Sequence, residues 1–208
     1  MQKSDQFTGV ILAGGRNSRF PGEKKAFRKV GQKRILDTIQ SVFAPIFKEI
    51  ILVVNDPEAF CDWDMMVVTD IIPARCALAG LHTGLYYAST PYIYVSACDT
   101  PFLNPGVIQY MMNQIEPGVE VVLPRSKGGV EPLSAVYAKS CLPQFEENLK
   151  QNEFMIKKSF RPRKIKEIPA TELRQFDPQL NFIFNINSPE DLVQAEQIRD
   201  AWEKKETP

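Results

Sequence analysis

A basic, glycine-rich loop near the N-terminus has the residue types that bind phosphate. Residues 10–12 form a short apolar run, and two adjacent glycines, Gly14 and Gly15, follow it. The next ten residues include four cations: Arg16, Arg19, Lys24 and Lys25. Backbone N–H groups that glycines leave uncovered form an anion-binding nest, and nearby cations neutralise the charge of the anion. The pattern predicts a phosphate site where a buried strand ends; the alternative is an ordinary turn with a solvated basic face.

This loop differs from two common phosphate-binding motifs. A Walker A loop needs a second glycine five residues after the first, but Phe20 stands five residues after Gly15. The motif also needs a hydroxyl residue after its lysine, and Ala26 follows Lys25. The dinucleotide fingerprint fails too, because Gly14 and Gly15 are adjacent and no third glycine is in register. The sequence therefore excludes both motifs.

Asp99 is the sharpest candidate for a metal ligand. It follows an apolar run at residues 93–97, with only Cys98 between, and it precedes Thr100-Pro101. A carboxylate at the end of a buried strand can hold Mg²⁺, a hard cation that takes oxygen ligands and bridges substrate phosphates. The alternative is an aspartate that caps a turn.

Other chemically capable residues are weaker candidates. His82 is the only histidine and has no partner in the pattern, so packing or a surface position is the better interpretation. Asp62 and Asp64 are expected to be solvated loop acids, and Cys98 a small buried residue. The cations between residues 157 and 163 are typical of a solvated face, with a binding lobe for an anionic second substrate as the alternative.

The elements around these residues alternate between strands and helices. Apolar runs predict strands at 10–12, 50–54, 67–68, 92–97, 119–123 and 132–138. Helical spacing predicts helices at 35–43, 78–88, 104–115 and 142–149. This order favours a mainly parallel sheet covered by helices on both faces. Because ligands bind beyond the carboxyl ends of such strands, Gly14, Asn55, Asp70 and Asp99 should converge on one crevice.

The last third of the chain is less regular. A short helix is expected within 153–163, an edge strand at 165–168, and a strand or extended loop at 181–187. Ser188 and Pro189 open a final helix, with serine as the N-cap and acids in the first turn. The tail at 204–208 is expected to be frayed.

Composition limits the classes of protein that this chain can be. The 208 residues suit one domain with a core at about residues 7–200. Lys plus Arg and Asp plus Glu number 25 each, so the net charge gives no reason to expect nucleic acid or a membrane as partner. Four cysteines without a C-x-x-C pair suggest reduced thiols, and no apolar stretch suggests a signal peptide or membrane span. We therefore expect a cytoplasmic protein.

Four segments together resemble one family, the nucleotidyltransferases related to molybdenum cofactor guanylyltransferase (MobA-like). Residues 12–15 (LAGG) with Arg19, Gly22 and Lys25 resemble its signature loop, although Phe20-Pro21 and Lys24 depart from the usual pattern. Proline at position 21 fixes φ and removes a donor, so the loop is expected to be reshaped. The other three segments are residues 77–81 (ALAGL) with a preceding aspartate, residues 97–102 (ACDTPF) and residues 184–192 (FNINSPEDL).

The resemblance implies a role for each matching residue. The catalytic residues would be Lys25, Asp99 and Arg19, with Asp99 as the Mg²⁺ ligand. Nucleotide binding would involve Leu12, Ala13, Gly14, Gly15, Lys25, Asn55, Asp70, Leu78, Ala79, Gly80 and Asp99. The pterin substrate would contact Arg19, Gly22, Asn185 and Asn187.

The resemblance also implies a fold and a reaction. The fold would be a single three-layer α/β/α Rossmann-like domain of the nucleotide-diphosphosugar transferase type. The reaction would transfer GMP from GTP to molybdenum-molybdopterin and release pyrophosphate, with transient contact to molybdopterin-synthesis proteins or molybdoenzymes. Two alternatives stay open at this point: a cytidylyl- or sugar-phosphate nucleotidyltransferase of the same fold, and a non-catalytic domain that binds GTP and delivers cofactor.

Overall fold

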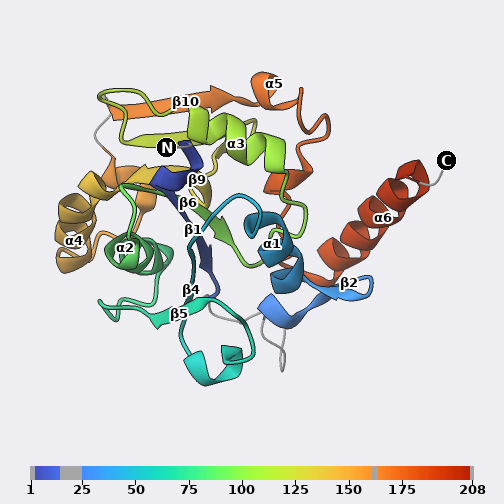
Figure 1. Ribbon diagram of the computed structural model, residues 1–208, viewed down its shortest axis with the longest axis horizontal. Coiled ribbons are helices and arrows are strands. Elements are labelled where there is room, and N and C mark those ends of the chain that lie inside the picture. Colours follow the sequence, from blue (N-terminus) through green and yellow to red (C-terminus); the bar gives the residue numbers. More distant parts are fainter. Residues whose placement is uncertain (1–2, 15–24, 161–163, 207–208) are drawn as a thin grey trace.

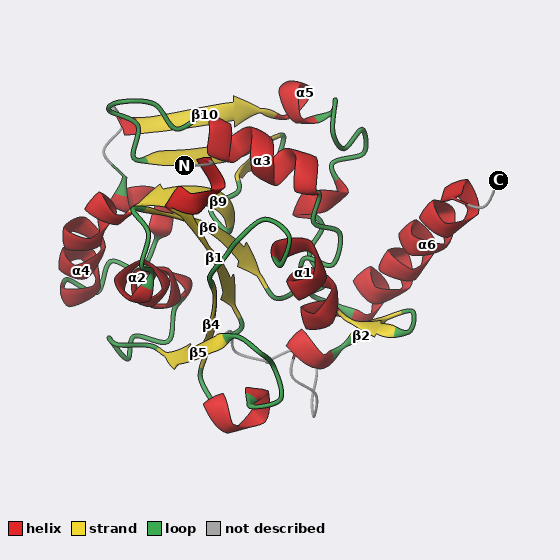
Figure 2. Ribbon diagram, viewed as in Figure 1, coloured by secondary structure: helices red, strands yellow, loops and turns green. Residues whose placement is uncertain are grey.

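The computed structural model describes residues 3–14, 25–160 and 164–206 and forms an α/β/α fold (Figures 1 and 2). An eight-stranded sheet has the order β10-β7-β9-β6-β1-β4-β5, with β8 paired to β7. Its strands are β1 (Phe7–Leu12), β4 (Ile50–Val54), β5 (Met66–Thr69), β6 (Tyr92–Ala97), β7 (Val121–Ser126), β8 (Gly129–Val130), β9 (Ser134–Ala138) and β10 (Ile165–Pro169). A separate hairpin pairs β2 (Lys29–Val30) with β3 (Lys33–Arg34).

The sheet is mainly parallel, as the alternation of strands and helices predicted. Strand β1 lies between β4 and β6 and is parallel to both, and β5 is parallel to β4. Strand β9 runs in the opposite direction between β6 and β7. The chain leaves β1 toward β4 and β5 and then returns to β6 on the other side of β1. The switch point of the topology is therefore next to β1, where open α/β sheets bind their ligands.

Helices cover both faces of the sheet. Figure 1 shows α1 (Ile35–Phe43) and α3 (Pro105–Asn113) on one side, and α2 (Ala77–Tyr87) and α4 (Leu142–Lys150) on the other. The buried side chains form two clusters that follow this division. In β1, Phe7 and Ile11 belong to the cluster with α1, and Val10 and Leu12 belong to the cluster with α2. The three-layer fold is confirmed.

Close packing fixes the elements that lead to the carboxyl edge of the sheet. A Cβ at Gly84 in α2 would lie 2.6 Å from Cγ1 of Val10, so α2 sits directly against β1. A Cβ at Gly9 would lie 2.7 Å from the rings of Phe43 and Phe47 on the other face. Glycines at these two positions let the central strand lie close to both helical layers.

Several sequence-based boundaries need correction. The strands expected at 119–123 and 132–138 begin two residues later, at Val121 and Ser134. Of the two alternatives for residues 181–187, the strand does not form and residues 184–187 are a loop. Leu180 has a left-handed backbone (φ 58°), and the Asp177 carboxylate accepts the Phe182 N–H (2.8 Å). These contacts bend the chain into a 3-10 turn at Asn181–Ile183.

The C-terminal end of the chain is a long helix. Helix α6 (Pro189–Glu206) includes residues 204–206, which the sequence analysis assigned to a frayed tail. Its C-terminal end projects away from the sheet, on the side of α1 (Figure 1). A short helix, α5 (Ala170–Leu173), follows the edge strand β10. Among the described residues, none of the helices is both long and apolar enough to cross a membrane.

Candidate active site

A cavity of about 520 Å³ opens at the carboxyl edge of strands β1, β4, β5 and β6. Pockets that bind small molecules typically measure about 300–1,000 Å³, so the cavity is large enough for a nucleotide. Its lining residues include most of the described candidates from the sequence: Leu12, Ala13, Gly14, Asn55, Asp70, Gly80 and Asp99. Residues more than eighty positions apart in the chain therefore meet here, as the convergence at strand ends predicted.

Part of the predicted site lies outside the described residues. Gly15, Arg19 and Gly22 belong to the segment 15–24, which the structure does not describe. Lys25 begins a short 3-10 turn (Lys25–Phe27), and only its backbone is described. Their predicted roles stay predictions.

Asn55 holds the glycine loop by a direct contact. Its side-chain amide donates a hydrogen bond to the carbonyl oxygen of Gly14. A Cβ at Gly14 would lie 3.0 Å from the Asn55 side-chain oxygen, so the loop and the asparagine are in close contact. The residue after β4 thus positions the residue that follows β1.

Asp70 is a partly desolvated acid at the β5 side of the cavity. Burial raises the pKa of its carboxyl group from the ordinary value to about 6. The next residue is fixed, because the Ile71 N–H donates to the hydroxyl of Thr83 in α2 (3.0 Å). Gly80 lies beside the acid: a Cβ there would lie 3.8 Å from an Asp70 oxygen, an ordinary van der Waals contact. Such a carboxylate is suited to accept hydrogen bonds from a ligand that excludes water.

Asp99 is tied to the segment that holds the two predicted pterin ligands. The Ile186 N–H donates to the backbone carbonyl of Asp99 (2.9 Å), and the Ile186 side chain is fully buried. Asn185, which is exposed, and Asn187, which is half-buried, stand on either side of Ile186. Neither asparagine lines the cavity itself, but the hydrogen bond brings both to its Asp99 end.

The donor set at Asp99 fits a magnesium ion that binds together with a nucleotide. No group of three or more His, Cys, Asp or Glu side chains in the described ranges could hold a metal by itself. Magnesium is usually held by one or two carboxylates together with substrate phosphates, and it keeps several waters. The single carboxylate of Asp99, in a cavity sized for a nucleotide, matches that requirement.

An aromatic cluster anchors the turn that contains Lys25. The Phe27 ring lies 4.9 Å from Phe60 and 5.5 Å from Trp63, with the last pair stacked at 3°. Phe60 also lines the cavity. Trp63 in turn donates to the Asp37 carboxylate of α1 (3.0 Å). The backbone after the basic loop is therefore fixed against the wall of the cavity.

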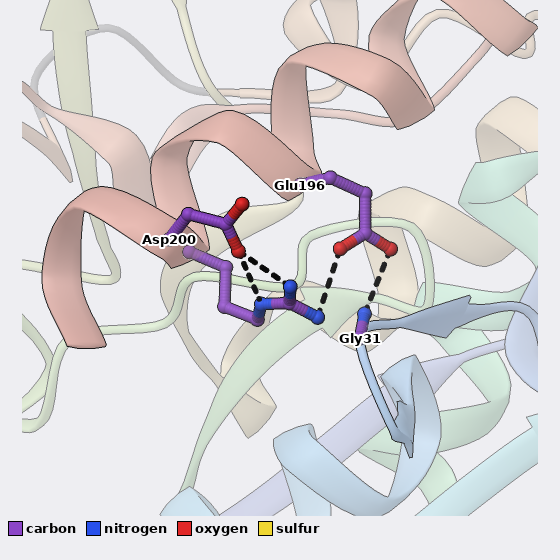
Figure 3. Close-up of polar contacts among 4 residues, drawn as sticks. Gly31, Glu196 and Asp200 are labelled. Atoms are coloured by element: carbon purple, nitrogen blue, oxygen red, sulfur yellow. Dashed lines mark hydrogen bonds and ion pairs between the residues drawn. The ribbon is translucent and has the colours of Figure 1, made fainter. Parts of the chain in front are cut away.

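The hairpin that follows this turn is fastened to α6. Glu196 accepts the Gly31 N–H (2.8 Å) and pairs with Arg199 through its other oxygen (2.8 Å), as Figure 3 shows. Arg199 also contacts Asp200. Gly31 has φ +64°, a left-handed conformation that glycine adopts without steric cost. Since α6 begins three residues after Ile186, it is linked to both sides of the cavity.

Some candidates from the sequence do not face the cavity. Leu78 and Ala79 were expected to bind the nucleotide, but both are fully buried in the core and do not line the cavity, because this face of α2 packs on the sheet. His82 is also buried, and burial lowers its pKa, so the packing interpretation is confirmed. Asp62 and Asp64 are exposed.

The basic run is only partly described. Lys157 and Lys158 are exposed in a 3-10 turn (Ile156–Ser159), and Lys158 pairs with Glu153 (3.1 Å). Neither lysine lines the cavity. Arg161 and Arg163 lie outside the described residues.

Several lining residues were missed by the sequence analysis, among them an aromatic ring and a cation. Phe60 and Arg75 both line the cavity, and neither belongs to a motif that was singled out. Arg75 lies in the loop between β5 and α2, between the candidate Asp70 and the ALAGL segment. This position in the sequence could have identified Arg75 as a candidate, because loops that follow parallel strands often carry binding residues.

Known proteins similar to this chain share both sequence and fold with it. The MobA-like NTP transferase domain matches residues 9–164. A molybdenum cofactor guanylyltransferase from Desulfosudis oleivorans is 38% identical over 192 residues, which cover 92% of this chain and 95% of that protein. A probable molybdenum cofactor guanylyltransferase from Natranaerobius thermophilus is 36% identical over 198 residues, covering 92% and 96% of the two chains.

A solved structure agrees with these relatives. Molybdopterin-guanine dinucleotide biosynthesis protein A from Archaeoglobus fulgidus has a TM-score of 0.83 and 26% identity, with 93% of this chain and 99% of that chain covered. The family match includes Gly14, Asn55, Asp70 and Asp99, which line one cavity. The chain therefore belongs to the MobA-like NTP transferase domain family.

Proposed function

We propose that this protein transfers GMP from GTP to the terminal phosphate of molybdenum-molybdopterin, forming the guanine dinucleotide cofactor and pyrophosphate. The observation that carries the proposal is the meeting of Gly14, Asn55, Asp70 and Asp99 at one nucleotide-sized cavity in a chain of this family. The curated relatives that bear the guanylyltransferase name favour GTP over the cytidylyl and sugar-phosphate alternatives.

The reaction is a displacement at phosphorus. An oxygen of the acceptor phosphate forms a bond to the α-phosphorus of GTP, the bond from that phosphorus to the bridging oxygen breaks, and pyrophosphate leaves with the electron pair. The protein's task is to hold two anions in line and to offset their charge.

Each part of the site would contribute to that task. The Gly14 and Gly15 amides and Lys25 would bind the triphosphate, with Asn55 keeping the loop in place through its bond to Gly14. Asp99 would hold Mg²⁺, which neutralises charge on the phosphates when it is bound. Arg19, Gly22, Asn185 and Asn187 would orient the pterin.

The proposal includes the cellular location and the partners of the enzyme. All four cysteines are free thiols, which supports a reducing, cytoplasmic location. The pterin would arrive from, and the product would leave to, molybdopterin-synthesis proteins or molybdoenzymes in transient contacts.

The test is pyrophosphate release with Mg²⁺ and molybdenum-loaded molybdopterin, comparing GTP, CTP and ATP. Release that is selective for GTP is the expected result. Release with CTP or ATP instead would contradict guanylyl transfer, and GTP binding without release in the presence of a competent acceptor would favour a non-catalytic delivery domain.

A further inference from the structure

Arg75 is a cation at the cavity, and no partner for it occurs in the part of the chain that the structure describes. It lines the cavity together with Asp70, and within the described ranges it makes no hydrogen bond or ion pair. Other arginines of the described part are engaged with protein groups: Arg34 with Asp37, Arg125 with Glu167, Arg174 with the Pro178 carbonyl, and Arg199 with Glu196 and Asp200. The five N–H donors of the Arg75 guanidinium are therefore available to a ligand.

The backbone that carries Arg75 is constrained. Arg75 has φ +48°, in the left-handed region that non-glycine residues seldom adopt. Hydrogen bonds hold the loop on both sides of it: the Ala74 N–H donates to the Ile72 carbonyl (2.7 Å), and the Ala79 N–H donates to the Cys76 carbonyl (3.1 Å). A costly conformation that its surroundings maintain is typical of residues at binding sites.

The loop that carries Arg75 begins at Asp70, at the other end of the strand order from Asp99. Asp99 follows β6 and Asp70 follows β5, and the strand order β6-β1-β4-β5 puts three strand intervals between them. At the usual spacing of neighbouring strands, this is about 14 Å. Gly14, after β1, and the candidate metal ligand Asp99, after β6, belong to the other end. A triphosphate would therefore lie at that end, and the Asp70 end would receive the nucleotide base.

The two charged groups at this end complement one base in particular. Guanine presents two acceptors, O6 and N7, next to two donors, N1–H and the 2-amino group. A guanidinium has donors only, and an ionised carboxylate has acceptors only. Adenine would turn its 6-amino donor toward the guanidinium, and cytosine would turn its ring and carbonyl acceptors toward the carboxylate. Both mismatches leave polar groups unpaired.

We propose that Arg75 is a specificity-determining residue that donates to O6 and N7 of guanine, while Asp70 accepts from N1–H and the 2-amino group. The inference rests on the proposed function, because it assumes that the cavity binds GTP. It extends that function by assigning the choice of base to a residue in the loop between β5 and α2. Arg75 also lines a neighbouring cavity of about 400 Å³ with Asn55, Thr69 and Pro73.

The test compares nucleotide binding by the full chain in Mg²⁺ for wild type, Arg75→Gln, Arg75→Lys and Asp70→Asn. The ligands are GTP, ATP, CTP, 7-deaza-GTP, which lacks N7, and ITP, which lacks the 2-amino group. Arg125→Gln is the matched control, since Arg125 is exposed, pairs with Glu167 and does not line the cavity. Unfolding temperatures verify that each variant is folded.

We expect wild type to bind GTP about 10- to 100-fold more tightly than 7-deaza-GTP, a size typical of one bidentate base contact. Arg75→Gln should lose this preference, and Arg75→Lys should keep part of it, because lysine retains the charge and can donate to these acceptors but lacks the planar geometry of the guanidinium. The preference over ITP should persist in the Arg75 variants and disappear in Asp70→Asn. Arg125→Gln should match wild type.

Two results would overturn the assignment of Arg75 alone. Equal weakening of GTP, ATP and CTP, with the 7-deaza preference intact, would make Arg75 a phosphate ligand. Unchanged GTP binding in both Arg75 variants would remove it from the site. A wild-type protein that binds none of the nucleotides would instead overturn the proposed function, and this inference with it.

Discussion

The backbone N–H of Ile186 donates a 2.9 Å hydrogen bond to the carbonyl oxygen of Asp99. The bond joins the loop after β6 to the segment that precedes α6. The candidate metal ligand and the two candidate pterin ligands, Asn185 and Asn187, are thereby held in one unit. Helix α6 also contacts the β2–β3 hairpin, because Glu196 accepts the Gly31 N–H. The C-terminal helix is therefore connected both to the segment at Asp99 and to the hairpin that follows Lys25.

The N-terminus of α6 should be sensitive to loss of its cap. The Asp191 N–H donates to the Ser188 hydroxyl (3.2 Å), and the Asp191 carboxylate accepts the Ser188 N–H (2.8 Å), which is a reciprocal capping arrangement. Ser188→Ala should lower the free energy of unfolding by about 1 kcal/mol. Urea titration measures the change. The exposed Ser41 serves as control, because the free energy of unfolding of Ser41→Ala should stay within about 0.5 kcal/mol of wild type. Equal losses of unfolding free energy in the two variants would contradict the capping role of Ser188.

The contact between the hairpin and α6 can be tested at Gly31. A Cβ there would lie 1.6 Å from Nη1 of Arg199, so Gly31→Ala must displace Arg199 from Glu196 in addition to straining φ. Gly118 also has positive φ (+90°), but nothing lies within 4 Å of the position that its Cβ would take, so Gly118→Ala carries the backbone cost alone. We expect about 1 kcal/mol of destabilisation for Gly118→Ala and about 1 kcal/mol more for Gly31→Ala. Denaturant unfolding that gives equal losses would show that the contact with α6 contributes nothing.

Asp70 should make the stability of the ligand-free protein depend on pH. Because burial raises the pKa of this carboxyl group to about 6, the folded protein binds its proton more tightly than the unfolded chain does. Stability therefore falls as the pH rises from about 4 to about 6, and the loss persists above that range. Asp70→Asn should raise the unfolding temperature relative to wild type at about pH 7.5, and much less at about pH 4.5.

Thermal unfolding at both pH values, without nucleotide, measures this effect. Asp64→Asn supplies the control, since Asp64 is exposed and does not line the cavity. A gain for Asp70→Asn that is the same at both pH values, or larger at the lower one, would contradict the account of Asp70.

The sequence predicted the site residues that directly follow strands. An apolar run that ends at a polar residue can be recognised from neighbouring positions in the sequence alone. Gly14, Asn55, Asp70 and Asp99 were placed correctly at one edge by that rule. Leu78 and Ala79 are buried and do not line the cavity, so their predicted role in nucleotide binding stays a prediction; a motif does not tell which face of a helix packs on the sheet. Arg75 was missed because its left-handed backbone and its position on the cavity wall depend on the tertiary structure. The turn at Asn181–Ile183 likewise depends on the non-local bond from Phe182 to Asp177.

The most direct test of the account is the rate of pyrophosphate release by Asp99→Ala and Lys25→Ala, with GTP, Mg²⁺ and molybdenum-loaded molybdopterin. The exposed Asp64→Ala variant is the control, and unfolding temperatures confirm that the variants fold. Loss of one pre-organised charge stabiliser typically costs about 10²–10³ in rate, so both site variants should fall at least that far while Asp64→Ala keeps the wild-type rate. Release by Asp99→Ala or Lys25→Ala within about tenfold of wild type would contradict the claim that this cavity is the active site.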